Sequence, residues 1–352
     1  MGEYRVAVTL GDVARHAGVS LATASRALNG SARSVTEELS AKVRASAEAL
    51  GYLPNAPAQA LARSSGATIG VLLHDVADPY FGGIARGVGD AAARAGLLSL
   101  VTSTDGDPRR ELEAIRMLHA HRVRAIVLAG SAYNDVSVIQ QLDEALAAYQ
   151  EQGGRVAAIT DHGPLYDTVQ VDNKEGAASL THSLARLGHR HFAVITGPER
   201  MRVAEDRLDG VLDALREIGL TPAEGMLQRT EFTREGGRAA MARILDVARE
   251  SGTPLPTAVL ALSDICAAGV LAELRDRGIS VPGEISVAGF DDIPLATDLA
   301  PALSTVRLPL ARMGESAVRL ALREGGRREA AETSSAFAEV VLRDSTAAPR
   351  VD

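Results

Sequence analysis

The sequence predicts an all-α head followed by a larger α/β body built on parallel sheets. Three observations predict this fold class. Residues 9–29 carry two short helical patterns around a glycine, apolar strand segments alternate with helical segments from Thr68 onward, and the charge differs between the two regions. Repeated β-α units place parallel strands in a sheet that has helices on both faces. A length of 352 residues is enough for about two or three such domains.

The first helical pair lies within residues 9–29. Thr9 is placed to cap the first helix, Gly18 supplies the turn, and Ser20 is placed to cap the second helix. The apolar positions expected to face the core of the head are Val13, Ala14, Ala17, Ala24 and Leu28. A third helix is expected to turn Val43, Ala47 and Leu50 inward and to end at Gly51. The order helix, glycine turn, helix predicts a DNA-reading helix-turn-helix.

Charge divides the chain at about residue 66. Residues 1–66 hold seven basic and five acidic residues, a balance of +2, and the remainder has a balance of −10. An acidic body with a mildly basic head fits a DNA reader fused to a domain that does not touch DNA. A balance of +2 over 66 residues decides nothing alone, so this prediction depends on the helix-turn-helix pattern as well.

Several short motifs of the head have a fixed spacing. They are Asp12-Val13-Ala14, Ala17-Gly18-Val19-Ser20, Thr23, Ser25-Arg26 and Leu28-Asn29. Together they resemble the opening signature of the lactose-repressor/galactose-repressor family of bacterial transcription regulators, and the resemblance extends over nearly the whole chain. It implies a helix-turn-helix DNA-binding domain at 1–53, a hinge helix or linker at 54–66, and an effector-binding and dimerisation domain at 67–352. Within the last, it implies a first lobe at about 67–165 and 295–328 and a second lobe at about 166–294 and 329–349.

The body is expected to have about ten strands, which suits two sheets better than one. The expected strands are Thr68–Leu73, Ser99–Ser103, Ala125–Leu128, Val156–Ile159, Val169–Val171, Phe192–Ile195, Met226–Arg229, Ala258–Ala261, Ser286–Phe290 and Ala338–Leu342. The resemblance implies a two-lobed architecture like that of periplasmic binding proteins. Its three crossover segments are expected near His162–Asp167, Asp292–Thr297 and Gly325–Thr333.

By the resemblance, the second helix reads DNA in the major groove. Leu21, Ala22 and Arg26 take the base-facing positions, and Arg is suited to paired hydrogen bonds with guanine. The other residues expected at DNA are Thr9, Ser20, Thr23, Ser25, Asn29, Tyr52, Asn55, Gln59 and Leu61. Leu21 has an alternative role as a staple packed on the core.

The hinge segment and the third helix depart from the family pattern. Leu61 stands where the family places a leucine wedge in the minor groove, although a plain linker stays open as an alternative. Pro57 is tolerable in a first helical turn, and Leu39 and Ser40 replace the family's Thr and Arg. A phosphate contact made by that Arg is therefore expected to be missing here.

Polar and aromatic residues follow the strands of the body, where ligands of open α/β sheets bind. The resemblance implies effector contacts at Asp78, Tyr80, Phe81, Ser131, Asp161, Arg207, Phe232, Ser263, Asp264 and Asp291. Carboxylates and Arg suit sugar hydroxyls, and aromatic rings suit the apolar sugar face. We therefore expect a sugar or sugar phosphate, with about half of these positions in contact. Tyr80 and Phe81 have an alternative place in the core, and Asp264 an alternative role as a helix cap.

Other function classes fit the sequence less well. No Walker loop, nucleophile elbow or metal-spaced Cys/His pair is present, so we expect no enzyme, no metal and no cofactor. His182, His189 and His191 are expected at a helix end and on the surface. No signal peptide or membrane-spanning segment is seen, which places the chain in the cytoplasm and disfavours a transport sugar-binding protein. A nucleoid-type binder fits the wedge but not the large body.

The expected partners are a double-stranded DNA operator and a small sugar-like effector, with no membrane. No leucine heptad follows the closing strand, which favours a homodimer over a coiled-coil tetramer. The predicted function is an allosteric, sequence-specific transcription regulator, expected to be a repressor at a near-palindromic operator.

Overall fold

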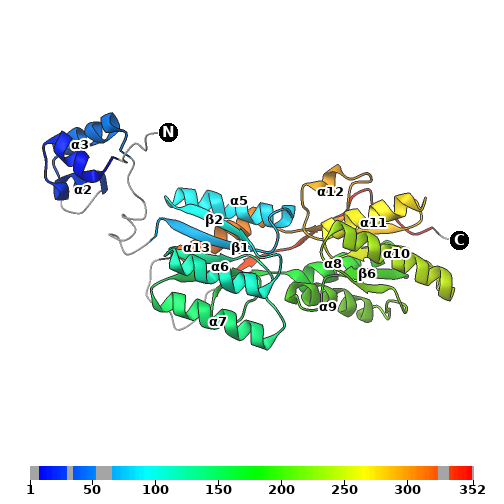
Figure 1. Cartoon of the computed structure of the whole chain (residues 1–352). Coiled ribbons are helices and arrows are strands. Elements are labelled where there is room, and N and C mark those ends of the chain that lie inside the picture. Colours follow the sequence, from blue (N-terminus) through cyan, green and yellow to red (C-terminus); the bar gives the residue numbers. More distant parts are fainter. Residues whose placement is uncertain (1–7, 30–34, 53–65, 324–332, 351–352) are drawn as a thin grey trace, which may run out of the picture. The chain divides into compact units, whose positions relative to one another are not determined.

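The computed structural model describes residues 8–29, 35–52, 66–323 and 333–350 (Figure 1). The chain forms two compact units, Met1–Gly66 and Ala67–Asp352, and each is described by itself. Within the described part of the chain, no helix combines the length and the apolar character that a membrane crossing requires.

The head contains three short helices packed on one small core. They are α1 (Leu10–Ala17), α2 (Leu21–Asn29) and α3 (Glu37–Leu50). Its buried side chains are Val13, Ala14, Ala17, Ala24, Val43 and Ala47, with Leu28 and Leu50 packed against them. Gly18 turns the chain between α1 and α2 at a φ of 66°, a conformation that favours glycine. The helix-turn-helix prediction is confirmed, together with the residues expected to face inward.

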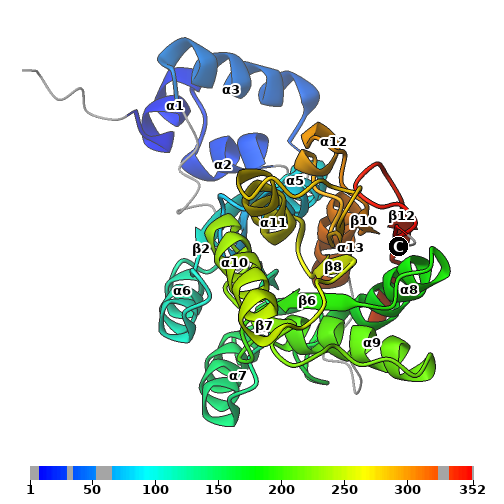
Figure 2. The ribbon, with the colours of Figure 1, turned by 90° about the vertical axis from the view of Figure 1, so that its right-hand side faces the viewer.

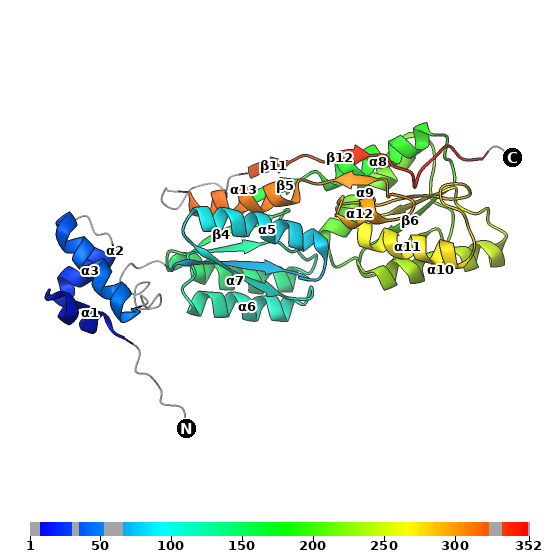
Figure 3. The ribbon, with the colours of Figure 1, turned by 90° about the horizontal axis from the view of Figure 1, so that it is seen from above.

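The first lobe of the body is a six-stranded parallel sheet in the order β11-β5-β4-β3-β1-β2. Its strands are β1 (Thr68–Leu73), β2 (Leu98–Ser103), β3 (Ala125–Leu128), β4 (Arg155–Ile159), β5 (Asp167–Val171) and β11 (Thr333–Ala336). Alternation along β1 builds two cores: Ile69, Val71 and Leu73 face one side, and Leu72 faces the other. The helices on the first side are α5 (Pro79–Arg94) and α13 (Leu310–Leu322), and those on the other are α6 (Pro108–Ala120) and α7 (Val136–Glu151) (Figure 3).

The second lobe is a four-stranded parallel sheet in the order β7-β6-β8-β9. Its strands are β6 (Phe192–Thr196), β7 (Leu227–Arg229), β8 (Ala258–Ala261) and β9 (Ser286–Ala288). The helix pair α8 (Asn173–Arg186) and α9 (Arg202–Glu217) covers one face, and α10 (Arg234–Ser251) and α11 (Asp264–Asp276) cover the other (Figure 2). The two-lobed α/β architecture is therefore as predicted.

Close helix approaches inside each lobe depend on glycine. A Cβ atom on Gly87 of α5 would lie 1.9 Å from the Ala311 carbonyl oxygen of α13, and one on Gly314 would lie 2.2 Å from the Ile84 oxygen. The helices α10 and α11 meet in the same way at Gly237. Because backbone lies against backbone here, any larger residue forces the helices apart.

The crossovers between the lobes lie further along the chain than expected. The strand β5 still belongs to the first sheet and the chain crosses near Asp172, so the expected crossover at His162–Asp167 is too early. The second crossing follows β10 (Thr305–Arg307), because α12 (Leu295–Asp298) still packs on the second lobe through Ala296. Most of the third expected crossover, Gly325–Thr333, lies outside the described residues.

The strand β11 was not predicted and joins the first sheet beside β5, so residues from about 329 do not all belong to the second lobe. The chain crosses between β11 and β12 (Glu339–Val341), which pairs antiparallel with β10. A strand of Thr and Ser residues has no apolar alternation, and a short apolar strand does not reveal which sheet it joins.

One histidine also differs from expectation: His189 is buried, and its ring bonds the Thr257 hydroxyl and the Ala347 carbonyl oxygen at 2.9 Å each.

Candidate functional site

The start of α2 presents an exposed face of the head. Leu21 is 57% exposed and lies outside the buried core of the head, which argues against the staple alternative. Ala22 and Arg26 are exposed on the same helix, and Arg26 Nε donates to the Ala22 carbonyl oxygen at 3.1 Å. An exposed helix face that carries an apolar side chain at its start and an Arg in its last turn has the chemistry needed to read base edges in the major groove.

Several residues expected at DNA also hold the head together. Thr9 and Asp12 form a reciprocal capping box at α1, and the Ser20 hydroxyl accepts from the Thr23 amide at 3.1 Å at the start of α2. Tyr52 packs on the core of the head, and Ser40 is buried, so its side chain is turned away from any surface contact. Ser25 is half-buried on α2. The structure describes Asn29 only as a helical position, and Asn55, Pro57, Gln59 and Leu61 lie outside the described residues.

The body contains a cavity of about 420 Å³ between its two lobes. Its lining comes from the loops that follow β1, β2, β3 and β4 of the first sheet and β6, β7, β8 and β9 of the second, together with the starts of α5 and α9. All eight loops leave the carboxyl ends of parallel strands, where open α/β sheets bind ligands. The volume suits a small organic molecule.

Eight of the ten expected effector residues line this cavity. They are Asp78, Tyr80, Phe81, Ser131, Arg207, Phe232, Ser263 and Asp291. Asp161 and Asp264 are outside the lining. Asp161 instead pairs with Arg202 at 3.3 Å and accepts from the Gly163 amide.

Arg207 and Asp291 form a buried ion pair in the wall of the second lobe. Arg207 Nη2 donates to Asp291 Oδ1 at 2.8 Å, Nε donates to Asn173 Oδ1 at 2.9 Å, and Nη1 donates to the Leu262 carbonyl oxygen at 2.7 Å. The guanidinium also lies 3.9 Å from the centre of the Phe290 ring. Burial raises the pKa of Asp291, and the positive charge of Arg207 opposes that rise. These bonds fix the guanidinium before any ligand arrives.

Aromatic rings line both sides of the cavity. Tyr80 and Phe81, at the start of α5, contact each other edge to face with ring centres 4.9 Å apart. Phe232 comes from the loop after β7, and its ring occupies the space where a Cβ of Gly197 would lie 2.5 Å away. All three rings also pack against the hydrophobic cores. Tyr80 and Phe81 therefore take both of the places considered for them, in the core and at the cavity. Such rings suit the apolar face of a sugar.

Carboxylates outnumber cations in the cavity wall. The lining contains two cations, Arg200 and Arg207, and five acids: Asp75, Asp78, Asp105, Glu231 and Asp291. Both cations are already paired, since Arg200 binds Glu231 through two hydrogen bonds of 2.8 and 3.0 Å. Burial raises the pKa of Asp78, which accepts from the Tyr80 amide as the cap of α5. The wall therefore offers acceptors and apolar surface, and it has little positive charge for an anion.

A second group of lining residues was not predicted from the sequence. The polar ones are His74, Asp75, Asp105, Thr160, Arg200, Glu231 and Thr233. Three lining residues other than glycine have a positive φ: Asp105 at 53°, Thr160 at 75° and Asp291 at 116°. Strained backbone of this kind often marks a ligand site. The strand ends could have indicated these loops, but not which side chain turns inward.

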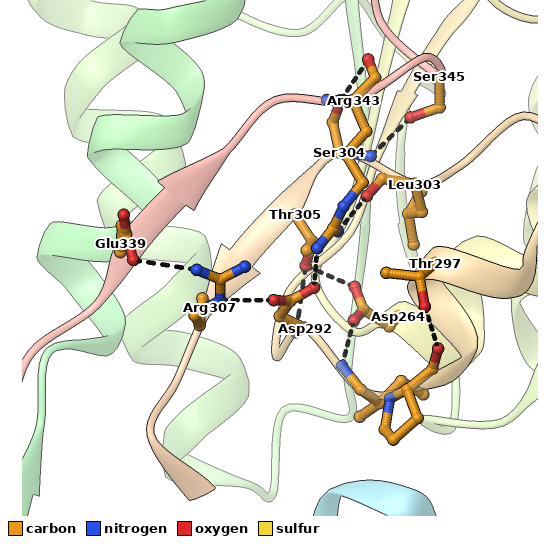
Figure 4. Close-up of polar contacts among 12 residues, drawn as sticks. Asp264, Asp292, Thr297, Leu303, Ser304, Thr305, Arg307, Glu339, Arg343 and Ser345 are labelled. Atoms are coloured by element: carbon orange, nitrogen blue, oxygen red, sulfur yellow. Dashed lines mark hydrogen bonds and ion pairs between the residues drawn. The ribbon is translucent and has the colours of Figure 1, made fainter.

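Asp264 and Asp292 belong to a polar network beside the crossovers (Figure 4). Asp264 accepts from the Thr305 hydroxyl at 2.6 Å and from the Ile293 amide at 2.9 Å. Asp292 accepts from Arg307 and from Arg343, each at 2.7 Å. Asp264 is thus bound to the neighbouring chain segments. It does not line the cavity, and it does not cap its own helix, whose N-cap residue is Ser263.

Direct contacts also join the two lobes at the edge of the cavity. We call these the rim contacts, and they connect residues 131–134 of the first lobe with residues 199–203 of the second. The Ser131 hydroxyl accepts from the Val203 amide at 3.1 Å, and backbone bonds run from Arg202 to Ala132 and from Asn134 to Arg200. A ligand between the lobes therefore lies next to the contacts that hold them together.

Two protein families match the chain. Residues 9–55 match the family described as bacterial regulatory proteins, lacI family, and residues 181–346 match a periplasmic binding protein-like domain. The HTH-type transcriptional regulator GalR of Escherichia coli (strain K12) is 34% identical over 337 residues, 95% of this chain and 94% of that protein. The HTH-type transcriptional repressor CytR of the same strain is 31% identical over 349 residues, 98% of both chains.

Solved structures agree with this relationship. A complex of the transcriptional regulator CelR with cellobiose has a TM-score of 0.69 and 28% identity, over 96% of this chain and 99% of that one. The lac repressor dimer bound to operator has a TM-score of 0.83 over 97% of this chain and 100% of that one, and at 24% identity it supports the fold alone. The curated relatives are transcription regulators and not enzymes. The chain belongs to the lacI family of bacterial DNA-binding transcription regulators.

Proposed function

We propose that this protein is a transcriptional repressor that binds a near-palindromic operator as a homodimer and is switched by an uncharged sugar-like effector. The observation that carries the proposal is the cavity between the lobes, with aromatic rings on both sides and a fixed Arg207–Asp291 pair. Because DNA is its partner, its place of action is the cytoplasm.

The effector is a sugar without a phosphate. A phosphate group would meet Asp75 and Asp78, for which no ion-pair partner is found among the described residues, while both lining Arg side chains are already paired. Anion recognition needs free donors or positive charge, whereas sugar hydroxyls also bond well to carboxylates. The bound cellobiose of CelR, a structural relative at 28% identity, supports the same class of ligand.

DNA reading is assigned to α2. Leu21 and Ala22 contact thymine methyl groups, and Arg26 leaves its bond to the Ala22 carbonyl oxygen to make paired bonds to a guanine. Ser20, Thr23, Ser25 and Asn29, with Thr9 and Tyr52 of the head, lie on the phosphate side, which positions the helix without reading sequence. Asn55, Gln59 and the Leu61 wedge extend this contact at the operator centre.

Dimer formation is supported by the edge of the first sheet. The strand β2 lies at one edge of this sheet, and its residues Leu98, Leu100 and Val101 are 70%, 40% and 43% exposed. An exposed apolar edge strand is unfavourable in a monomer and is usually covered. A homodimer with two-fold symmetry then accounts for a near-palindromic operator.

The switch couples the cavity to the lobes. A ligand held between the lobes favours the arrangement in which it contacts both walls, and the rim contacts form only when the lobes are close. In the dimer, this changes the spacing of the two segments that lead to the DNA-binding heads. Effector and operator therefore alter each other's affinity by the same factor.

Operator selection tests the proposal. The purified full-length protein is incubated with a random DNA pool, with and without each member of a panel of sugars and sugar phosphates. We expect one palindromic site to be enriched, and one unphosphorylated sugar to weaken or strengthen that enrichment. Enrichment of no sequence under any condition contradicts the specific-repressor proposal, and a response only to sugar phosphates contradicts the effector class. Arg26→Ala is the control variant, and it should lose the selected site but keep salt-dependent binding to random DNA.

A further inference from the structure

Two buried polar atoms in the described part of the chain have no hydrogen-bond partner. They are His74 Nε2 and Thr160 Oγ1, on side chains of residues that are 7% and 8% exposed. Most buried polar atoms in proteins are bonded, because burial without a partner gives up the hydrogen bonds that the atom makes with water. Such atoms therefore need a specific explanation.

Both residues line the effector cavity, on the wall of the first lobe. His74 follows β1 and Thr160 follows β4, so each stands at the carboxyl end of a parallel strand. The imidazole lies over Gly130, where a Cβ atom would be 2.5 Å from Nε2, and Thr160 has a φ of 75°. The chain thus uses a glycine and a strained backbone position to keep two unbonded polar groups at this wall.

Both groups are uncharged at neutral pH. Burial lowers the pKa of His74 to about 4, so the ring is neutral, and a threonine hydroxyl does not ionise. A neutral imidazole nitrogen either donates or accepts, and a hydroxyl does both. A ligand hydroxyl satisfies either atom whichever ring nitrogen carries the proton, whereas a phosphate could only accept.

We propose that His74 Nε2 and Thr160 Oγ1 form a hydroxyl-binding subsite on the first-lobe wall, which selects an uncharged polyhydroxylated effector. The inference rests on the proposed function and adds two recognition residues that the sequence pattern does not indicate. The subsite bonds two ligand hydroxyl groups that lie opposite the Arg207–Asp291 pair. It leaves the fold less stable without ligand than an apolar wall would.

The test compares affinity with stability in the full-length protein. His74→Phe and Thr160→Val remove the two unbonded atoms. The matched controls are His189→Phe and Thr181→Val, since both controls remove buried groups that are bonded, the Thr181 hydroxyl to the Ala177 carbonyl oxygen at 2.8 Å. The probes for calorimetry are glucose, galactose, ribose and cellobiose, with glucose 6-phosphate as the anionic comparison.

We expect the two cavity variants to bind the sugar that wild type prefers about tenfold more weakly, equivalent to about 1.4 kcal/mol. Their urea midpoints should stay at or above that of wild type, because each loses an unbonded polar group. The two control variants should show the opposite pattern: wild-type affinity and a lower urea midpoint.

Two results would overturn the hydroxyl-binding subsite alone, and a third would also overturn the proposed effector class. If wild type binds a sugar and both cavity variants keep its affinity, the subsite is wrong and the sugar-regulator proposal stands. If the cavity variants lose stability but not affinity, the atoms are bonded within the protein and not to effector, which also contradicts the subsite. If wild type binds none of the sugars, the proposed effector class fails and the subsite fails with it.

Discussion

The two walls of the cavity differ in how far their polar groups are already bonded. On the second-lobe wall, Arg207 makes three hydrogen bonds and Arg200 makes two, so both cations are fixed without a ligand. On the first-lobe wall, His74 and Thr160 each keep an unbonded atom. The two walls therefore act differently. The preorganised second-lobe wall orients the effector, and the first-lobe wall, with its two unbonded atoms, gains hydrogen bonds only when the effector brings the lobes together.

The largest effect is expected at the bonded wall. Asp291→Ala leaves the Arg207 guanidinium buried and unpaired, which should lower the free energy of unfolding by about 3–5 kcal/mol. Urea unfolding measures this loss. The control is Asp78→Asn on the opposite wall, which keeps the cap of α5 and should leave stability nearly unchanged. Equal losses of unfolding free energy in Asp291→Ala and Asp78→Asn would contradict the difference in bonding between the two walls.

The next effect is a pH dependence at the unsatisfied wall. Burial lowers the pKa of His74 to about 4. Below pH 6.5 the His74 ring is therefore protonated in the unfolded chain but stays neutral in the folded protein until the pH approaches 4. Keeping the buried ring neutral therefore costs nothing above pH 6.5, and the free energy of unfolding falls as the pH drops from 6.5 towards 4. Between pH 7 and pH 5, the unfolding free energy of wild type should fall by about 2 kcal/mol more than that of His74→Phe. Parallel pH profiles of the two proteins would contradict a buried, neutral His74.

A smaller effect is expected where the walls meet. Ser131→Ala removes the hydroxyl that accepts from the Val203 amide across the rim contacts. Loss of one such bond should weaken sugar affinity by about 1 kcal/mol, roughly fivefold, by disfavouring the closed lobes. Calorimetry with the preferred sugar measures the change. Ser137→Ala, in the first turn of α7 and outside the cavity lining, is the control and should bind as wild type does.

The smallest effect is expected at the open end of the second wall. Arg200 and Glu231 are about half exposed, so water and salt screen their attraction. Glu231→Gln should change the free energy of unfolding by less than about 1 kcal/mol. A loss as large as that of Asp291→Ala would mean that this pair is as important as the buried one, and thermal unfolding at low and high salt separates the two cases.

The sequence predicted the head and the two-lobed body because their signals are local. Capping at Thr9, the turn at Gly18 and apolar periodicity all act within a few residues. The place of β11 was not predictable, because its residues Thr333–Ala336 carry no apolar alternation and its partner β5 lies more than 150 residues earlier. The crossovers were misplaced for the same reason, since they follow from which sheet each short strand joins.

The candidate site was predictable to the level of the loop but not of the side chain. Every expected effector residue follows a strand end or lies within the first two turns of a neighbouring helix, but a shift of one residue along the chain decides which side chain faces the cavity. Thr160 lines the cavity while Asp161 turns to Arg202, and Ser263 lines it while Asp264 turns to Thr305. Backbone conformation, such as the φ of 75° at Thr160, determines which of two neighbouring side chains faces the cavity. Residue type alone does not predict that conformation.

In the proposed switch, ligand binding in the cavity and DNA binding by the head change each other's affinity. Two pairs of titrations test this coupling: the affinity of full-length protein for its selected operator with and without the preferred sugar, and its affinity for that sugar with and without operator. We predict that the two ratios are equal and differ from one by about fivefold or more, the usual range of allosteric coupling. Ratios of one in both directions would contradict this coupling, because sugar and operator would then bind independently.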